Sequence, residues 1–340
     1  MAEIVLGMWT THGPTLSTTP EQWLLRVPVD RASEAHWYRG STYTFQELVE
    51  IRRAENLSAQ ISLEERTRRS DACSAAIEKM ADMFAQASPD VAVIIGNDQR
   101  ELFLEAITPA ITVFCGDTLW DRPATPEQAS RMPPGIHEAE AGHKPPERRE
   151  YPGLPDLASG IVREGITSGF DPAVSKSLPE NPGHWSSGVG HAFGFVYRRI
   201  MRDRVIPHVP IIFNTFFPPN QPTARRCFEF GRMVGRVLRR WSPEKRVAVF
   251  GSGGMSHFVI DEPFDRAFLN AIMQRNGEAL AEMAEPLFQS GTSELKNWIV
   301  AAGILFDTEL RGEVVDYQPC YRSEAGTGTA NGFVYWDRPR

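Results

Sequence analysis

One apolar run ends in glycines and then presents a histidine: Arg246-Val247-Ala248-Val249-Phe250-Gly251-Ser252-Gly253-Gly254-Met255-Ser256-His257. Its apolar half is typical of a short strand that is buried on both faces. Glycines tolerate positive φ and allow the chain to turn sharply after the strand. Ligands of open α/β sheets bind beyond the carboxyl ends of the strands. His257 is therefore a candidate acid–base group or metal ligand, although a turn histidine that only bonds to the backbone explains the segment equally well.

Three further apolar runs end in polar residues or glycine in the same way, and amphipathic segments separate them. The predicted strands span residues 4–9, 91–95, 209–213 and 247–250. The predicted helices span residues 64–86, 223–241 and 264–288. This alternation predicts an α/β fold with a largely parallel or mixed central sheet flanked by helices, as a single catalytic domain over residues 1–340.

Two segments interrupt this alternation and are predicted to be insertions. Residues 15–62 mix loop and helix patterns, and residues 116–150 are rich in proline and charge. Because long loops in compact domains usually carry function or form interfaces, we expect one or both segments to cover a site.

The bulk composition excludes several classes of protein. The chain has 340 residues, 41% of them hydrophobic and 23% charged, and a net charge of -7, so it lacks the basic footprint of a nucleic-acid-binding protein. No apolar stretch approaches the ~20 residues that span a bilayer, and the first residues do not form a signal peptide. Four widely spaced cysteines argue against a disulfide framework or a structural zinc site and favour the cytoplasm.

Three histidines and one carboxylate are the candidates for chemistry. His12 and His257 follow predicted strands at the same end of the sheet, and His191 lies in a glycine-flanked turn. Glu294 follows Ser293 in a pattern that is also typical of a helix cap. These residue types suggest a two-histidine, one-carboxylate centre for non-haem iron. Four of the other five histidines are expected to be structural or exposed: His208 is expected to be structural, His137 and His143 to be solvated in the proline-rich segment, and His184 to be either.

The order of these motifs resembles the class III extradiol ring-cleaving dioxygenases, the family of protocatechuate 4,5-dioxygenase catalytic subunits, gallate dioxygenases and 3-O-methylgallate dioxygenases. The likeness runs nearly end to end, through residues 10–14, 190–191, 251–257, 293–298 and 325–332. It implies an Fe(II) enzyme that opens the ring of a catechol-like aromatic acid with O2, beside the hydroxyl pair. By this resemblance His12 and Glu294 are iron ligands, while His257 and His191 are catalytic.

The chain departs from the family pattern after the second predicted strand. The founding members of the family have a histidine ligand directly after Asn-Asp, and this chain has Gln99 after Asn97-Asp98. Three interpretations follow. Gln99 ligates the metal or contacts a metal-bound water, or another histidine replaces it, with His36 as the candidate. In the third interpretation the site has lost iron or changed its chemistry.

The resemblance extends to substrate and partners. The Asp-Gln pair and the long N-terminal segment are similar to the methylgallate-type branch, which favours an O-methylated or trihydroxylated benzoate. Thr11 or Arg100 would bind its carboxylate. Cover for the site would come from the two insertions within the chain or across a homodimer, or from a small partner subunit. The alternatives are a metal enzyme with different oxidative or non-redox chemistry and a non-catalytic binding protein, which the retention of His12, His191, His257 and Glu294 argues against.

Overall fold

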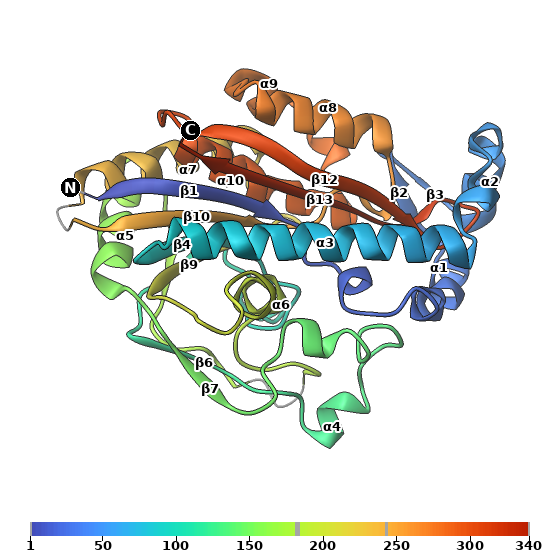
Figure 1. Ribbon diagram of the computed structural model, residues 1–340, viewed down its shortest axis with the longest axis horizontal. Coiled ribbons are helices and arrows are strands. Elements are labelled where there is room, and N and C mark those ends of the chain that lie inside the picture. The colour runs from blue at the N-terminus through green and yellow to red at the C-terminus, as the bar shows by residue number, and fades with distance from the viewer. Residues whose placement is uncertain (1, 181–183, 242–243, 339–340) are drawn as a thin grey trace.

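A nine-stranded mixed sheet runs through the centre of the computed structural model, which describes residues 2–180, 184–241 and 244–338 (Figure 1). Its strands are β1 (Glu3–Thr10), β4 (Val91–Asn97), β5 (Ile111–Phe114), β8 (Ala173–Ser175), β9 (His208–Phe213), β10 (Arg246–Ser252), β11 (His257–Val259), β12 (Arg311–Tyr321) and β13 (Thr327–Asp337). Their order is β11-β13-β1-β10-β4-β9-β5-β8, and β12 pairs with the outer side of β13.

The four strands predicted from the sequence form the parallel centre of this sheet. β1, β10, β4 and β9 are neighbours and run parallel, whereas β13 and β5 flank them as antiparallel strands. Alternate side chains of β4 enter different cores, with Val93 in one cluster and Ile94 in the other. Burial on both faces explains why these strands read as continuous apolar runs. The predicted α/β fold with a mixed sheet is confirmed.

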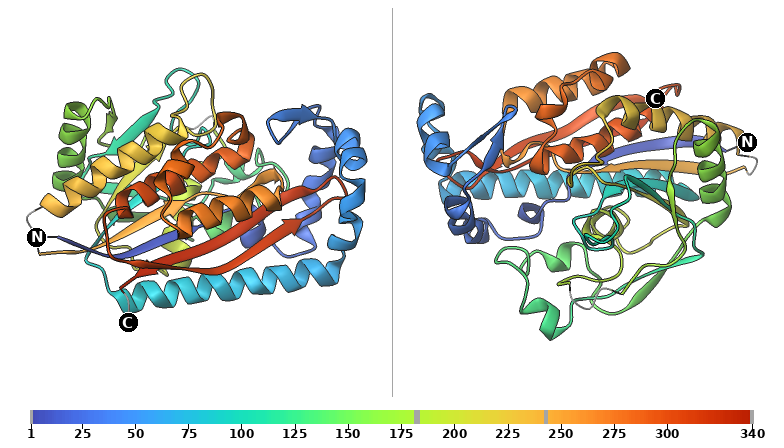
Figure 2. Two further views of the ribbon diagram at one scale, coloured as in Figure 1. Left: turned by 90° about the horizontal axis from the view of Figure 1, so that it is seen from above. Right: turned by 180° about the vertical axis from the view of Figure 1, so that it is seen from behind.

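Helices cover both faces of the sheet, as Figures 1 and 2 show. One face carries α5 (Pro155–Thr167), α7 (Ala224–Arg240), α8 (Glu262–Met273), α9 (Gly277–Ala281) and α10 (Leu295–Leu305). The other carries α3 (Leu63–Ala87), α6 (His191–Phe195) and the π-helical turn η6 (Val196–Ile200). Side chains cap the two longest helices, because Ser62 accepts from the Glu65 N–H and Thr223 accepts from the Arg226 N–H.

Two sequence predictions of secondary structure are corrected. The single helix expected over residues 264–288 is divided into α8, α9 and the 3₁₀ turn η7 (Glu285–Leu287). Arg275 has a φ of 52°, which ends α8, and Asn276 caps α9 through the Ala279 N–H. The long β12–β13 hairpin was not predicted, and it extends the sheet beyond β1.

The two insertions fold into small elements that contact each other. The first contains η1 (Pro14–Leu16), η2 (Gln22–Arg26), α1 (Val27–Ala32), β2 (His36–Tyr38), β3 (Ser41–Tyr43), α2 (Phe45–Ile51), η3 (Arg53–Glu55) and η4 (Leu57–Gln60). The second contains β6 (Thr118–Asp121), α4 (Pro126–Ala129), η5 (Glu140–Gly142) and β7 (Arg149–Pro152). Gly142 packs so closely on Ser17 that an added Cβ would overlap its side chain. The two insertions of a single chain therefore pack against each other at Gly142 and Ser17.

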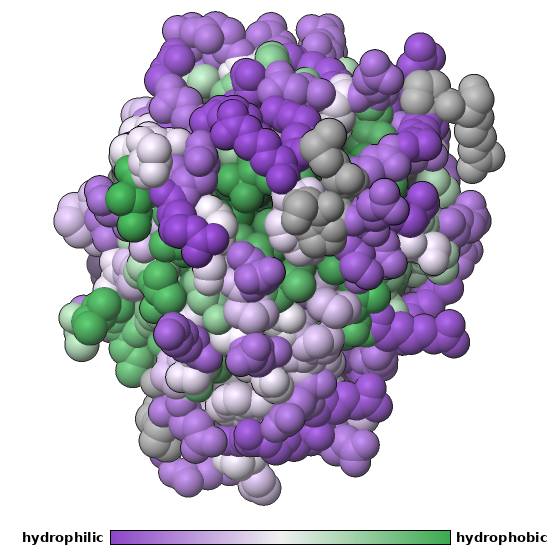
Figure 3. All heavy atoms as spheres, turned by 90° about the vertical axis from the view of Figure 1, so that its left-hand side faces the viewer, coloured by the Kyte–Doolittle hydropathy of each residue, from purple (hydrophilic) through white to green (hydrophobic). Residues whose placement is uncertain are grey.

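The outer surface is mainly hydrophilic on the face that lies at the left of Figure 1. Figure 3 shows hydrophobic residues there only as small areas between polar ones. Among the residues that the structure describes, no helix combines the length and the apolar character needed to cross a membrane. All four cysteines lie in the described ranges and are free thiols.

His208 is a structural histidine, and it makes stability depend on pH. The buried ring contacts the Tyr197 hydroxyl through Nε2 and the Ile206 carbonyl through Nδ1 at 2.9 Å. Burial lowers the pKa of His208 to about 4, so the folded protein holds the neutral ring while the unfolded chain binds a proton. This contribution to stability is complete above the ordinary histidine pKa of about 6.5 and is lost as the pH falls through about 4.

We expect His208 to reduce the free energy of unfolding by about 3 kcal/mol over that interval. The His208→Gln variant removes the titrating group and should show a shallower loss of stability on acidification. Urea denaturation across the interval measures it, and equal pH dependence in both proteins would contradict the assignment.

Candidate active site

A cavity of about 290 Å³ lies where the parallel strands end. Five of the residues singled out in the sequence line it: His12, Gln99, His191, His257 and Glu294. Both insertions contribute to its wall, through residues 14–26 and residues 135–143. Ligands of α/β sheets bind at this edge, and the cover predicted for the insertions is present within the chain.

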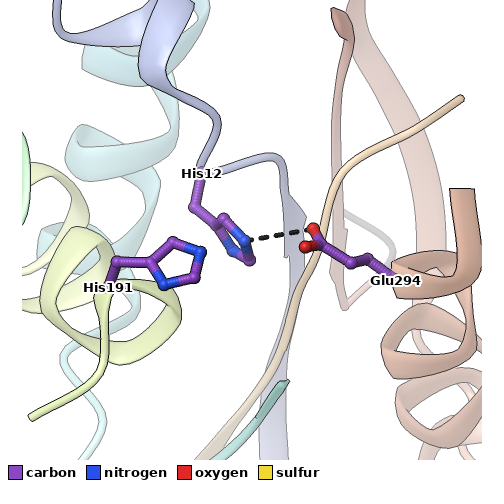
Figure 4. Close-up of side chains that lie close together, drawn as sticks. All are labelled: His12, His191 and Glu294. Carbon is purple, nitrogen blue, oxygen red and sulfur yellow. Dashed lines mark ion pairs between the residues drawn. The ribbon is translucent and has the colours of Figure 1, made fainter. Parts of the chain in front are cut away.

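His12, His191 and Glu294 meet at the base of this cavity (Figure 4). Each offers one potential ligand atom, and these atoms all lie within 4.8 Å of one another. His12 follows β1, His191 begins α6, and Glu294 ends the 3₁₀ turn η8 (Ser290–Glu294) just before α10. Glu294 makes no side-chain cap of α10, so the helix-cap interpretation of its sequence pattern is wrong.

The hydrogen bonds of His12 fix which of its nitrogens carries the proton. The Ser252 hydroxyl donates to the Ala192 carbonyl at 2.6 Å, so it accepts from Nδ1 of His12 at 2.9 Å. Nε2 is then a lone-pair atom, and it lies 3.1 Å from Oε2 of Glu294. Within the described part of the chain, Nε2 has no hydrogen-bond partner. Two buried atoms that carry lone pairs and no proton, His12 Nε2 and Glu294 Oε2, thus face each other. A cation bound between them would interact favourably with both.

Glu294 is held as an ionised carboxylate. Its Oε1 accepts from the amides of Asn97 at 3.0 Å and Gln99 at 3.2 Å, and its Oε2 accepts from the Gly254 N–H at 2.8 Å. Burial raises the pKa of this carboxyl, but His12 and His257 lower it more, and the pKa ends well below its ordinary value. Burial lowers the pKa of His12 in turn. An anionic oxygen beside a neutral imidazole fits a divalent metal ion.

Ser252 should matter for metal binding because it holds the His12 ring by hydrogen bond. The Ser252→Ala variant removes the acceptor that holds the His12 Nδ1 proton, so the ring can turn or change tautomer. We expect metal affinity to fall about 10- to 100-fold, as for other partners of metal-bound histidines. Metal titration of the variant measures this, with Ser130→Ala on the exposed second insertion as control. Equal affinity in both variants would contradict the assigned tautomer.

His191 forms a dyad with Glu101, a residue that sequence reasoning missed. Glu101 accepts from the backbone N–H of His191 at 2.9 Å and contacts its Nδ1 at 2.8 Å. Burial lowers the pKa of His191, but Glu101 and Glu294 outweigh it and raise the pKa to about 8. Buried Lys144 donates to the carbonyls of Ser187 and Val189 and fixes the turn that leads into His191. The one sequence signal for Glu101 was its position two residues after Gln99.

His257 faces the same oxygen of Glu294 as His12 does, at a longer distance. Its Nδ1 donates to the Met255 carbonyl at 2.7 Å, and its Nε2 lies 3.8 Å from Oε2 of Glu294. Added Cβ atoms at Gly254 and Gly291 would fall 2.3 and 2.2 Å from ring atoms, so both glycines are needed to house the imidazole. Burial lowers the pKa of His257, but Glu294 raises it more, and the net pKa lies above the ordinary value.

The two candidates for the missing ligand lie in different places. Gln99 lines the cavity, and its amide nitrogen donates to Glu294. His36 lies on β2, where Nε2 bonds to the Asp30 carbonyl at 2.8 Å and the ring contacts Phe45. The structure therefore does not bring His36 to the centre, because the β2–β3 hairpin holds it in the first insertion.

Two predicted substrate contacts lie away from the cavity. The Thr11 hydroxyl accepts from the Gly332 N–H at 3.0 Å, and the Arg100 guanidinium pairs with Glu105 at 2.6 Å and covers Phe217. Neither residue is among the described residues that line the cavity. The expectation that His143 is solvated is wrong. It lines the cavity with its ring 6.1 Å from that of His191, because η5 folds the second insertion inward.

Comparison with known proteins agrees with this geometry. Residues 60–328 match the family model described as the catalytic LigB subunit of aromatic ring-opening dioxygenase. A 2,3-dihydroxyphenylpropionate/2,3-dihydroxicinnamic acid 1,2-dioxygenase of Rhodococcus sp is 28% identical over 188 residues, which cover 55% of this chain and 49% of that protein. The Azotobacter vinelandii enzyme of the same name is 35% identical over 30% of this chain and 29% of its own length.

A gallate dioxygenase of Pseudomonas putida is 33% identical over 95 residues, 25% of this chain and 28% of that enzyme. The matched part thus spans about half the length of the first relative and less than a third of the other two. The family model, however, covers most of the chain, from the start of α3 to the β12–β13 hairpin. The chain therefore belongs to the family of catalytic LigB subunits of aromatic ring-opening dioxygenases, as its sequence motifs predicted.

Proposed function

We propose that the protein is an Fe(II)-dependent extradiol dioxygenase that opens the ring of a catechol-like aromatic acid with O2. The observation that carries the proposal is the buried approach of His12 Nε2 to Glu294 Oε2 without a shared proton. Nitrogen and carboxylate donors of this kind suit non-haem iron. The resemblance to extradiol dioxygenases implies a metal, and the names of two relatives point to aromatic acids. We also propose the cytoplasm as its compartment, because free cysteines suit reducing conditions.

His12, His191 and Glu294 would hold the ion, and Gln99 would orient the carboxylate. The Gln99 amide already donates to Oε1 of Glu294, whereas a nitrogen of His191 lies within 4.8 Å of the other two ligand atoms. Glu101 supplies the carboxylate partner that metal-bound histidines usually have. Metal binding would displace the second proton that the raised pKa gives His191.

Iron content of purified variants separates these ligand sets. His191→Ala is expected to lose iron, Gln99→Ala to bind it more weakly, and His36→Ala to bind it like the parent protein. Iron retained in His191→Ala but lost in Gln99→Ala would make Gln99 the third ligand. Iron lost only in His36→Ala would require the first insertion to rearrange.

The protein residues around the centre divide the remaining work. Bound Fe(II) would supply the redox chemistry that joins O2 to the ring. His257 lies beside Glu294 and its Nδ1 donates to the Met255 carbonyl, so its Nε2 is placed to accept the phenolic proton and return it as the ring opens. The insertions and Trp185 line the cavity and would limit the access of water to a bound substrate.

Oxygen uptake tests the proposed activity. The protein is loaded with Fe(II) without air and then offered protocatechuate, gallate and 3-O-methylgallate, with 3-O-methylgallate and gallate expected to be preferred. Uptake coupled to a new ring-opened chromophore supports the proposal and ranks the substrates. Bound iron without uptake would point to a different reaction on the same fold, and no bound iron would make the site a binding pocket. Full activity of a monomer would show that the insertions of one chain provide sufficient cover.

A further inference from the structure

The cavity has a second charged region, formed by two arginines. Arg26, the last residue of η2, and Arg322, just after β12, both line it. Arg322 lowers the pKa of both Arg26 and His257, so it is near each of them. The cavity therefore contains a cationic wall besides the metal centre, and the first insertion contributes Arg26 to it.

Only one of the two arginines has its charge matched. Arg322 binds Asp30 through two hydrogen bonds, of 2.6 and 2.9 Å, and both side chains are buried. Thr327 donates to the same carboxylate and leaves it little capacity for another cation. Arg26 forms no ion pair with any residue of the described ranges, and its guanidinium donates a long hydrogen bond of 3.4 Å to the Pro134 carbonyl. Arg26 is thus an unpaired cation facing the cavity.

The surroundings of Arg26 hold its side chain and remove water from it. Gly135 of the second insertion packs on the aliphatic part, where an added Cβ would lie 3.0 Å from Cδ of Arg26. Gly135 has a φ of 82°, which favours glycine at this contact. Burial and the nearby Arg322 lower the pKa of Arg26, while Asp30 raises it. A partly desolvated guanidinium without a counter-ion gains most from an anionic ligand.

We propose that Arg26 binds the carboxylate of the aromatic substrate and makes the enzyme select carboxylated catechols over neutral ones. The proposal rests on the function proposed above, since the hydroxyl pair must lie at the metal centre. It replaces Thr11 and Arg100, whose side chains contact Gly332 and Glu105 instead. Arginine suits this role because its planar donors match the two oxygens of a carboxylate.

Equilibrium binding without oxygen tests the role of Arg26. Three ligands are titrated calorimetrically: 3,4-dihydroxybenzoate, 4-methylcatechol, which lacks the carboxylate, and benzoate, which lacks the hydroxyl pair. The Arg26→Gln variant is expected to bind the two carboxylates about 10- to 100-fold more weakly and 4-methylcatechol within about twofold of the parent protein. Arg31→Gln is the matched control, because Arg31 lies on the next helix, is exposed and pairs with Glu324.

The outcomes separate this proposal from the proposed function. Equal loss for all three ligands in Arg26→Gln, or no loss for any, would overturn the role of Arg26. Benzoate that binds as tightly as 3,4-dihydroxybenzoate and depends on Arg26, without binding of 4-methylcatechol, would support the carboxylate site and overturn the dioxygenase proposal. Arg26→Lys keeps the charge and should restore part of the affinity for carboxylates, so a general folding defect is distinguished from loss of the cation. Loss in Arg31→Gln equal to that in Arg26→Gln would also contradict the proposal.

Discussion

The Glu294→Gln variant is expected to lose bound iron and, with it, oxygen uptake. Three N–H groups point at the carboxylate, from Asn97, Gln99 and Gly254. In the variant, one of the two accepting oxygens becomes an amide NH₂ group, so its hydrogens face N–H donors. The substitution also removes the negative charge. Both changes act on a buried ligand, where an uncompensated donor is costly. Ser252→Ala, which removes only a hydrogen-bond partner of a ligand, is expected to lower metal affinity roughly 10- to 100-fold. We expect the loss in iron affinity of Glu294→Gln to exceed that factor.

Iron content and oxygen uptake are measured on the same preparations. Glu282→Gln is the matched control, because Glu282 is exposed at the end of α9 and pairs with Arg225. Thermal unfolding of both metal-free variants shows whether the fold is intact. A folded Glu294→Gln protein that keeps its iron would remove Glu294 from the ligand set.

The His257→Gln variant is expected to keep its iron and lose turnover. His257 contacts neither of the other two histidines by hydrogen bond, and its Nε2 lies farther from Glu294 than that of His12. Its Nδ1 bond to Met255 aims the other nitrogen into the cavity, where a glutamine amide cannot transfer a proton at neutral pH. Loss of a general acid–base residue typically costs 10²–10⁴-fold, so we expect kcat to fall by about that factor and the affinity for substrate to change little.

Turnover at saturating substrate and iron content together measure this effect. His137→Gln, at an exposed position of the second insertion, serves as the control. Loss of iron in His257→Gln would place His257 among the ligands rather than at the proton-transfer step. Unchanged kcat would exclude it from the chemistry.

The sheet centre and much of the site could be predicted from the sequence for one physical reason. Strands buried on both faces are recognisable as apolar runs, and their carboxyl ends meet at one edge. His12, Gln99 and His257 follow such runs, so the prediction placed them together, and the structure does too. The β12–β13 hairpin was missed because its outer strand mixes polar and apolar residues without regular alternation or a continuous apolar run.

Other residues of the site could not be predicted because the insertions position them. Arg26 and His143 reach the cavity through irregular chain that has no periodic pattern, so their distance from the centre could not be judged from the sequence. Glu101 was missed because its link to His191 joins residues 90 positions apart in the sequence. His36 was a candidate ligand for the same reason. The sequence around it does not indicate that a hairpin directs its ring toward Asp30.

Isotope labelling of the product tests whether the protein is a ring-opening dioxygenase. The iron-loaded protein is given 3-O-methylgallate or gallate under ¹⁸O₂, and the product is examined by mass spectrometry. We expect a ring-opened acid that carries both atoms of one oxygen molecule, formed by the parent protein and not by Glu294→Gln. An intact aromatic ring, a product with a single labelled oxygen, or equal product from Glu294→Gln would contradict it.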